Sequence, residues 1–132
     1  MTDTLQPLLT AAAGLLFRSE SDYPFAPFTH ENPGGGPLEV PQLLSWLALP
    51  PDTPVQRQEL AYFFRNHTRE PLGASAEQTE LAHRFQRLQA ALEAALRAPT
   101  AYCVGQTQVQ AYLLGQDPDG NFAGLTTTLI QT

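Results

Sequence analysis

The sequence has one cysteine, no lysine and no long apolar run, and each absence excludes a class of protein. The single cysteine, Cys103, excludes an intrachain disulfide, and no CxxC or histidine motif around it has the spacing of a zinc site. No apolar run approaches the length that spans a membrane, and the first residues lack the positive charge of a signal peptide. We therefore expect a cytoplasmic protein that has no membrane partner.

All seven cations are arginines, and they are outnumbered by 13 acidic residues, which gives a net charge of -6. An acidic protein repels the phosphates of a nucleic acid, so direct binding to DNA or RNA is disfavoured. The same field attracts a basic protein partner and speeds its approach. The alternative is that this charge serves solubility alone. With 132 residues, 42% of them hydrophobic, the chain is expected to fold as one domain over residues 1–132.

In the first third, apolar residues at three- and four-residue steps predict a helix from Leu5 to Leu16, with Pro7 in its first turn. Thr2, Asp3 or Thr4 supplies its cap. A strand is predicted from residue 25 to 31, at a sheet edge because it contains proline. A glycine- and proline-rich loop follows over residues 32–37.

Residues 38–54 fit either one or two helical turns or a short strand. An extended segment and a short helix are predicted over residues 55–66. Ser75 and Gln78 then form a capping-box pattern that begins a long helix, which Pro99 is expected to stop. Three antiparallel strands at residues 102–104, 109–114 and 122–131 complete the chain. The fold class is therefore α+β, a mostly antiparallel sheet with helices packed on it.

No pattern in the sequence indicates an enzyme. The three histidines lack the four-residue spacing of a helical zinc motif, and the glycines at 34–36 lack the Lys-Ser/Thr of a phosphate loop. Glu20 and Asp22 lie in one loop, which is common, and nothing indicates a sugar-binding cleft for paired carboxylates. Cys103 lies in a strand pattern and is interpreted as a small buried hydrophobic residue.

Two segments remain as candidate sites. The first is the loop with Ser19, Glu20, Ser21 and Asp22 at its tip, which aromatic residues fix at both ends. It is either an ordinary polar connection between a helix and a strand or a loop that carries function on a rigid scaffold. The second is the strand that ends at Gln131 and Thr132. Its α-carboxylate is charged at neutral pH and is a suitable ligand for Mg²⁺. The alternative is that the gene simply ends at a strand and that its last residue has no such role.

Residues 15–25, with the sequence Leu-Leu-Phe-Arg-Ser-Glu-Ser-Asp-Tyr-Pro-Phe, resemble the opening motif of the nuclease A inhibitor family. The last third is similar to that family as well, through Arg-Phe-Gln-Arg-Leu at 84–88, Gly105 and the segment from Tyr112 to Thr132. The resemblance covers most of the chain in matching order and length. In residues 70–75 the sequence departs from the family member compared, whose acidic loop carries a tryptophan.

The resemblance implies an α/β/α sandwich that inhibits a magnesium-dependent, non-specific DNA/RNA endonuclease in a one-to-one complex. It implies that Thr132 approaches the catalytic metal and that Glu20 reaches basic groups of the nuclease site. Such a protein has no cofactor of its own, and any bridging Mg²⁺ belongs to the basic partner. The alternative is a regulatory interaction module that shares this fold but has no nuclease target. The implied partner-binding residues are Ser19, Glu20, Ser21, Asp22, Gln131 and Thr132.

Overall fold

The computed structural model describes residues 4–130 and contains a five-stranded antiparallel sheet, a two-stranded hairpin and five helices within that range. The sheet order is β3-β7-β6-β5-β4, and β1 pairs with β2 outside it. The strands are β1 (Leu16–Arg18), β2 (Asp22–Pro24), β3 (Ala26–His30), β4 (Val55–Gln58), β5 (Arg97–Val104), β6 (Gln108–Gln116) and β7 (Phe122–Ile130). The helices are α1 (Leu5–Ala12), α2 (Val40–Trp46), α3 (Leu60–Phe63), α4 (Arg65–Thr68) and α5 (Ala76–Ala95).

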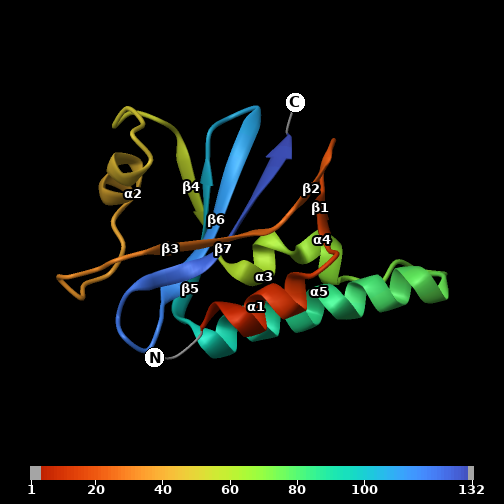
Figure 1. The fold of residues 1–132 in the computed structure, drawn as a ribbon. Helices are drawn as coiled ribbons and strands as arrows, with labels where there is room; N and C mark the ends of the chain where they lie inside the picture. The colour runs from red at the N-terminus through yellow and green to blue at the C-terminus, as the bar shows by residue number, and fades with distance from the viewer. Residues whose placement is uncertain (1–3, 131–132) are drawn as a thin grey trace.

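Helices cover both faces of the sheet, so the predicted α/β/α sandwich is confirmed. On one face α1, α3 and α5 share a large core with β5, β6 and β7. On the other face α2 packs on a smaller core that includes Tyr102, Leu114 and Phe122. Figure 1 shows α5 running beneath the sheet, with the start of α1 and the end of β7 at opposite ends of the molecule. Among the described helices, none is both long and apolar enough to cross a membrane.

Helix α5 begins where the sequence predicts, because the capping box closes. The Ser75 hydroxyl accepts the Gln78 N–H at 3.1 Å, and the Gln78 side chain accepts the Ser75 N–H at 2.8 Å. The predicted end at Pro99 is wrong. The helix ends at Ala95, and Pro99 lies inside β5, where a register irregularity between Arg97 and Thr100 accommodates it.

Helix α1 is shorter than predicted. Pro7 lies in its first turn and Thr4 is at its N-cap position, although the Thr4 side chain makes no capping bond; Thr2 and Asp3 lie outside the described residues. The helix ends at Ala12, and Gly14 has a φ of +77°, a conformation that glycine adopts readily. After Gly14 the chain continues into strand β1, in which Leu16 is exposed. The predicted continuous helix from Leu5 to Leu16 is therefore wrong.

The structure settles residues 38–54 in favour of a helix. Glu39 and Gln42 form a capping box, and Pro41 occupies the first turn of α2, where a missing N–H is tolerated. The expected short helix after β4 is divided into α3 and α4. Strand β3 is an edge strand that contains proline, as predicted, and β5, β6 and β7 form the predicted antiparallel meander.

Candidate functional site: the β1–β2 hairpin and the end of β7

The segment predicted as a helix-to-strand connection is a β-hairpin. Phe17 lies opposite Tyr23 and Arg18 opposite Asp22, which leaves Ser19, Glu20 and Ser21 as the tip. The Ser21 carbonyl accepts both the Ser19 N–H at 3.2 Å and the Ser19 hydroxyl at 2.8 Å. These two bonds close the tip, so the acidic side chains of Glu20, in the tip, and Asp22, beside it, are carried by a defined backbone.

The hairpin is bonded to the last strand of the sheet. The Ile130 N–H donates to the Ser19 hydroxyl oxygen at 3.0 Å, and the Thr127 hydroxyl donates to the Pro24 carbonyl at 2.9 Å. These contacts join residues more than a hundred positions apart in the sequence. The tip of the hairpin and the end of β7 therefore form one surface.

Aromatic rings fix the root of the hairpin. Phe17 stacks on Phe63 with ring centroids 4.6 Å apart and on His67 at 4.3 Å. His67 Nε2 accepts the Arg18 N–H at 3.0 Å. Phe25, just after β2, packs edge-on against Phe17 and Phe85. The expected pinning by aromatic residues is confirmed for Phe17, which is buried, and for Phe25, which is partly buried against the core.

The electrostatics of this root favour a neutral imidazole. His67 is 6% exposed, and burial lowers its pKa from 6.5 to about 4, with the Arg18 charge acting in the same direction. The bond from Arg18 and the Asp22 carboxylate oppose this shift but do not reverse it. Since Nε2 accepts a hydrogen bond, the neutral ring carries its proton on Nδ1.

This shift predicts a pH dependence of stability. Between about pH 6.5 and pH 4 the unfolded chain binds a proton at His67 that the folded chain does not, so stability falls as the pH decreases through this window. The loss attributable to this group is up to about 3 kcal/mol. Urea unfolding of the parent and of His67→Gln at pH 7.5, 6 and 5 gives the free energy of unfolding at each pH. The variant has no imidazole to titrate, so its free energy of unfolding should fall less than that of the parent as the pH decreases. His83→Gln is the control, since His83 pairs with Glu70 at the surface; equal slopes for the parent and His67→Gln would contradict the prediction.

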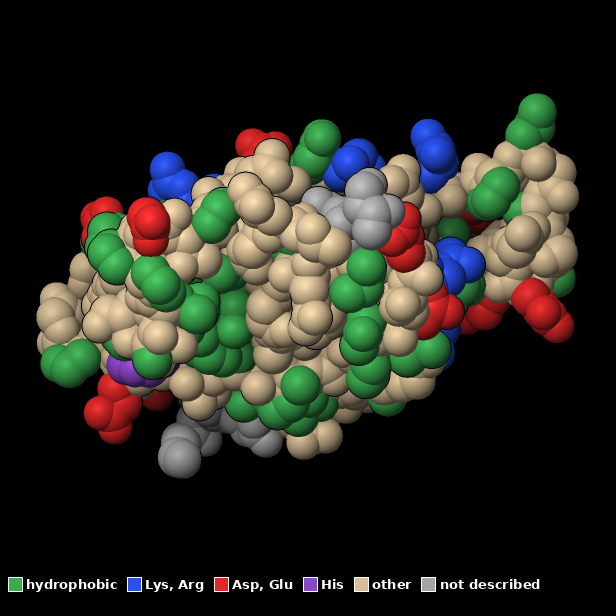
Figure 2. Space-filling view, turned by 90° about the horizontal axis from the view of Figure 1, so that it is seen from above, with side chains coloured by type: hydrophobic (Ala, Val, Ile, Leu, Met, Phe, Trp, Pro, Cys, Tyr) green, Lys and Arg blue, Asp and Glu red, His purple; other side chains and the backbone are tan. Residues whose placement is uncertain are grey.

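The structure brings four of the six predicted site residues together. Ser19, Glu20, Ser21 and Asp22 are exposed on one hairpin beside the end of β7. Gln131 and Thr132 lie outside the described residues. Figure 2 looks onto this end of the molecule, where acidic side chains lie at the surface interspersed with arginines.

The histidines and the cysteine, which could serve as metal ligands or catalytic groups, lie in separate parts of the structure. His30 stacks on Trp46 at one end of β3, His83 pairs with Glu70 at 2.7 Å on α5, and His67 lies under the hairpin. Within residues 4–130, no group of three or more histidine, cysteine or acidic residues could hold a metal ion. Cys103 is buried in β5, and burial raises the pKa of its thiol to about 11, which disfavours a reactive thiolate.

The sequence patterns excluded His67 from a helical zinc motif but did not identify it as the support of the hairpin. The available signal was local: His67 follows Phe63 and Phe64 at helical spacing, which places its ring on their buried side. The role of the Thr127 hydroxyl was also missed, since threonine is an ordinary strand residue.

Comparison with known proteins shows which family model the chain matches. No curated protein matches the chain. The family model described as "Nuclease A inhibitor-like protein" (NuiA) matches residues 2–132, nearly the whole sequence, and so includes the hairpin, the sheet and all three layers. The chain therefore belongs to the nuclease A inhibitor-like protein family.

Proposed function

We propose that this protein inhibits a magnesium-dependent, non-specific nuclease by placing the carboxylates of Glu20 and Thr132 in its active site. Membership of an inhibitor family supports a nuclease as the partner. The single observation that carries the proposed surface is the 3.0 Å bond from the Ile130 N–H to the Ser19 hydroxyl. It couples the acidic hairpin to the strand that leads to Thr132.

The chemistry is substrate mimicry. A nuclease holds phosphate oxygens with a divalent cation and with arginine or lysine side chains. Carboxylate oxygens are also hard anionic ligands that Mg²⁺ accepts in place of water. In the proposed complex the Thr132 carboxylate replaces the scissile phosphate on the partner's metal, and Glu20 replaces a phosphate charge against a basic side chain.

The remaining residues of the surface have supporting roles. The closed turn from Ser19 to Ser21 fixes where Glu20 emerges, so less conformational entropy is lost on binding. Asp22 adds negative charge at the foot of the same turn, and the net charge of -6 steers the protein toward a basic partner. The complex contains one inhibitor and one nuclease, and the cation is supplied by the nuclease.

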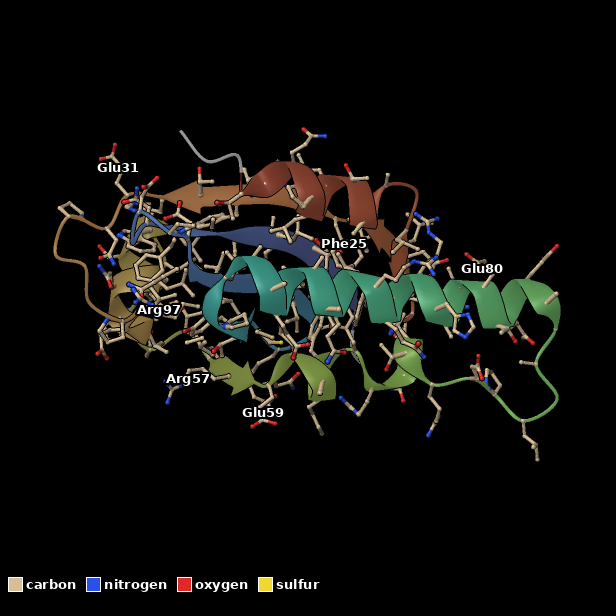
Figure 3. The ribbon with its side chains drawn as sticks, turned by 90° about the horizontal axis from the view of Figure 1, so that it is seen from below. Phe25, Glu31, Arg57, Glu59, Glu80 and Arg97 are labelled. Carbon is tan, nitrogen blue, oxygen red and sulfur yellow. The ribbon has the colours of Figure 1, made fainter. Side chains whose placement is uncertain are left out.

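Replacing Glu20 with alanine is expected to weaken binding to a sensitive nuclease by about 1.5–3 kcal/mol, the range for a hydrogen bond to a charged group. Inhibition titrations against a magnesium-dependent non-specific nuclease measure this change. Glu31→Ala is the matched control, because it removes the same charge from an exposed residue just after β3, at the other end of the molecule from the hairpin (Figure 3). Equal losses for the two variants would mean that Glu20 acts only through net charge.

A further inference from the structure

A cavity of about 200 Å³ lies under the hairpin, between β1, β7 and the α3–α4 segment. Its floor is buried and mostly apolar, and its rim is exposed and polar. Neither the inhibitory mechanism proposed above nor the packing of the core uses it. The lining residues are Phe17, Arg18, Ser19, Gln58, Phe63, Arg65, Asn66, His67, Cys103 and Leu129.

The charge of this lining is opposite to that of the protein. Acidic residues outnumber arginines 13 to 7 in the sequence, yet the lining contains Arg18 and Arg65 and no carboxylate. Neither arginine forms a salt bridge within the described residues, where the ion pairs are His83–Glu70 and Arg87–Glu80. Asp22 lies opposite Arg18 in the hairpin but does not line the cavity, so the charged side chains of the lining itself are both positive.

The arginines retain donors for a ligand. Arg65 is positioned by one bond, from Nη1 to the Tyr62 carbonyl at 2.7 Å, and by stacking 3.8 Å from the centre of the Tyr62 ring. A guanidinium has five N–H donors, so most remain available. Within residues 4–130 the Arg18 side chain has no hydrogen bond, since the bond to His67 uses its backbone N–H.

The histidine in the wall reinforces this donor character. Its Nε2 accepts from Arg18, so its proton lies on Nδ1, which is buried and has no hydrogen-bond partner among the described residues. The ring thus leaves one unpaired N–H buried in the wall and presents no free acceptor that would repel an anion. Gln58 and Asn66 add side-chain amides, and the buried Cys103 stays a neutral thiol.

From this lining we propose that the cavity is a binding site for a small oxyanion, a carboxylate or phosphate group recognised by the guanidinium groups of Arg18 and Arg65. The volume suits this class of ligand, because pockets for drug-sized molecules start at about 300 Å³ and a water occupies about 30 Å³. The site does not depend on nuclease inhibition. It adjoins the inhibitory surface, however, since Arg18 precedes the hairpin tip and Leu129 precedes Ile130.

The test is a titration of the full chain with sodium acetate and, separately, with inorganic phosphate at pH 7.5 and constant ionic strength. Amide chemical shifts of ¹⁵N-labelled protein report the position of binding. We expect saturable shifts at Arg18, Asn66 and His67 with a Kd below about 10 mM for at least one probe. Saturation by acetate alone identifies a carboxylate site, and saturation by phosphate alone identifies a phosphate site.

Arg18→Gln and Arg65→Gln are each expected to raise that Kd by at least about tenfold, with dispersed spectra verifying that both fold. Arg87→Gln is the matched control, because its guanidinium pairs with Glu80 on α5 outside the cavity, and it should leave the Kd unchanged. The proposal is overturned if neither probe saturates, or if Arg87→Gln weakens binding as much as the cavity variants do. Since the measurement uses no nuclease, its failure leaves the inhibitory mechanism unaffected.

Discussion

Deleting Thr132 is expected to raise the inhibition constant against a sensitive nuclease by at least about 100-fold, or about 2.8 kcal/mol. The reason is that the deletion removes the proposed metal ligand and moves the α-carboxylate back by one residue along the chain. A loss of this size is typical of a central interface residue. Steady-state inhibition with excess Mg²⁺ measures it, and circular dichroism of the variant should match the parent because the deleted residue lies beyond the described sheet.

Two further variants separate the carboxylate from the side chain. Adding one glycine after Thr132 keeps every residue but displaces the terminal carboxylate, and we expect it to be as damaging as the deletion. Thr132→Ser keeps both the carboxylate and a hydroxyl, and we expect inhibition within about tenfold of the parent. Full inhibition by the glycine-extended chain would exclude the terminal carboxylate as the metal ligand.

Gly124→Ala is expected to destabilise the fold by more than about 4 kcal/mol, a loss that only a few mechanisms produce. Gly124 lies in β7 between Phe28 of β3 and Leu114 of β6. A Cβ atom there would lie 1.8 Å from the Leu113 carbonyl oxygen, which belongs to the backbone and cannot rotate away. The variant must therefore separate β7 from β6 and break part of their hydrogen-bond ladder. Urea unfolding followed by circular dichroism measures the change.

Gly34→Ala is the control for this prediction. An added Cβ at Gly34 meets no atom within 4 Å, and its φ is not in the left-handed region. We expect its stability to stay within about 0.5 kcal/mol of the parent, as for most surface substitutions. Equal free energies of unfolding for Gly124→Ala and Gly34→Ala would contradict the close approach of β7 and β6 at Gly124.

The carboxyl-terminal half of the fold could be predicted because its signals are local. Asp117 shows this well, since its side chain accepts the Asp119 N–H at 2.9 Å and the Asn121 N–H at 3.0 Å. An Asx turn followed by Gly-Asn needs only neighbouring residues to form. The same holds for the Ser75 capping box, whose partner is three residues away.

The boundary between α1 and β1 could not be predicted in this way. Leu15 and Leu16 continue the helical spacing of the residues before them, and either a helix or a strand can bury one of the two. Gly14 decides the outcome by reversing the chain, and Leu15 is then buried while Leu16 is exposed. Helical periodicity alone does not report where a glycine is used as a terminator.

The candidate site was predicted in its residues but not in its assembly. The acidic tip was visible as a polar cluster between aromatic residues, although composition alone favoured an ordinary polar connection. What the sequence could not reveal is that Ser19 bonds Ile130, because no local rule links positions 111 residues apart. The arginine-lined cavity was hidden for the same reason, since its walls come from six separate elements.

The placement of the start of α1 and the end of β7 at opposite ends of the molecule has a practical consequence for handling the protein (Figure 1). A purification tag, fluorophore or surface linker attached ahead of α1 leaves the hairpin and the end of β7 facing solution. The same group attached after β7 would occupy the face that the nuclease is proposed to meet. Biosensor and pull-down experiments on this protein should therefore immobilise it through its amino-terminal end.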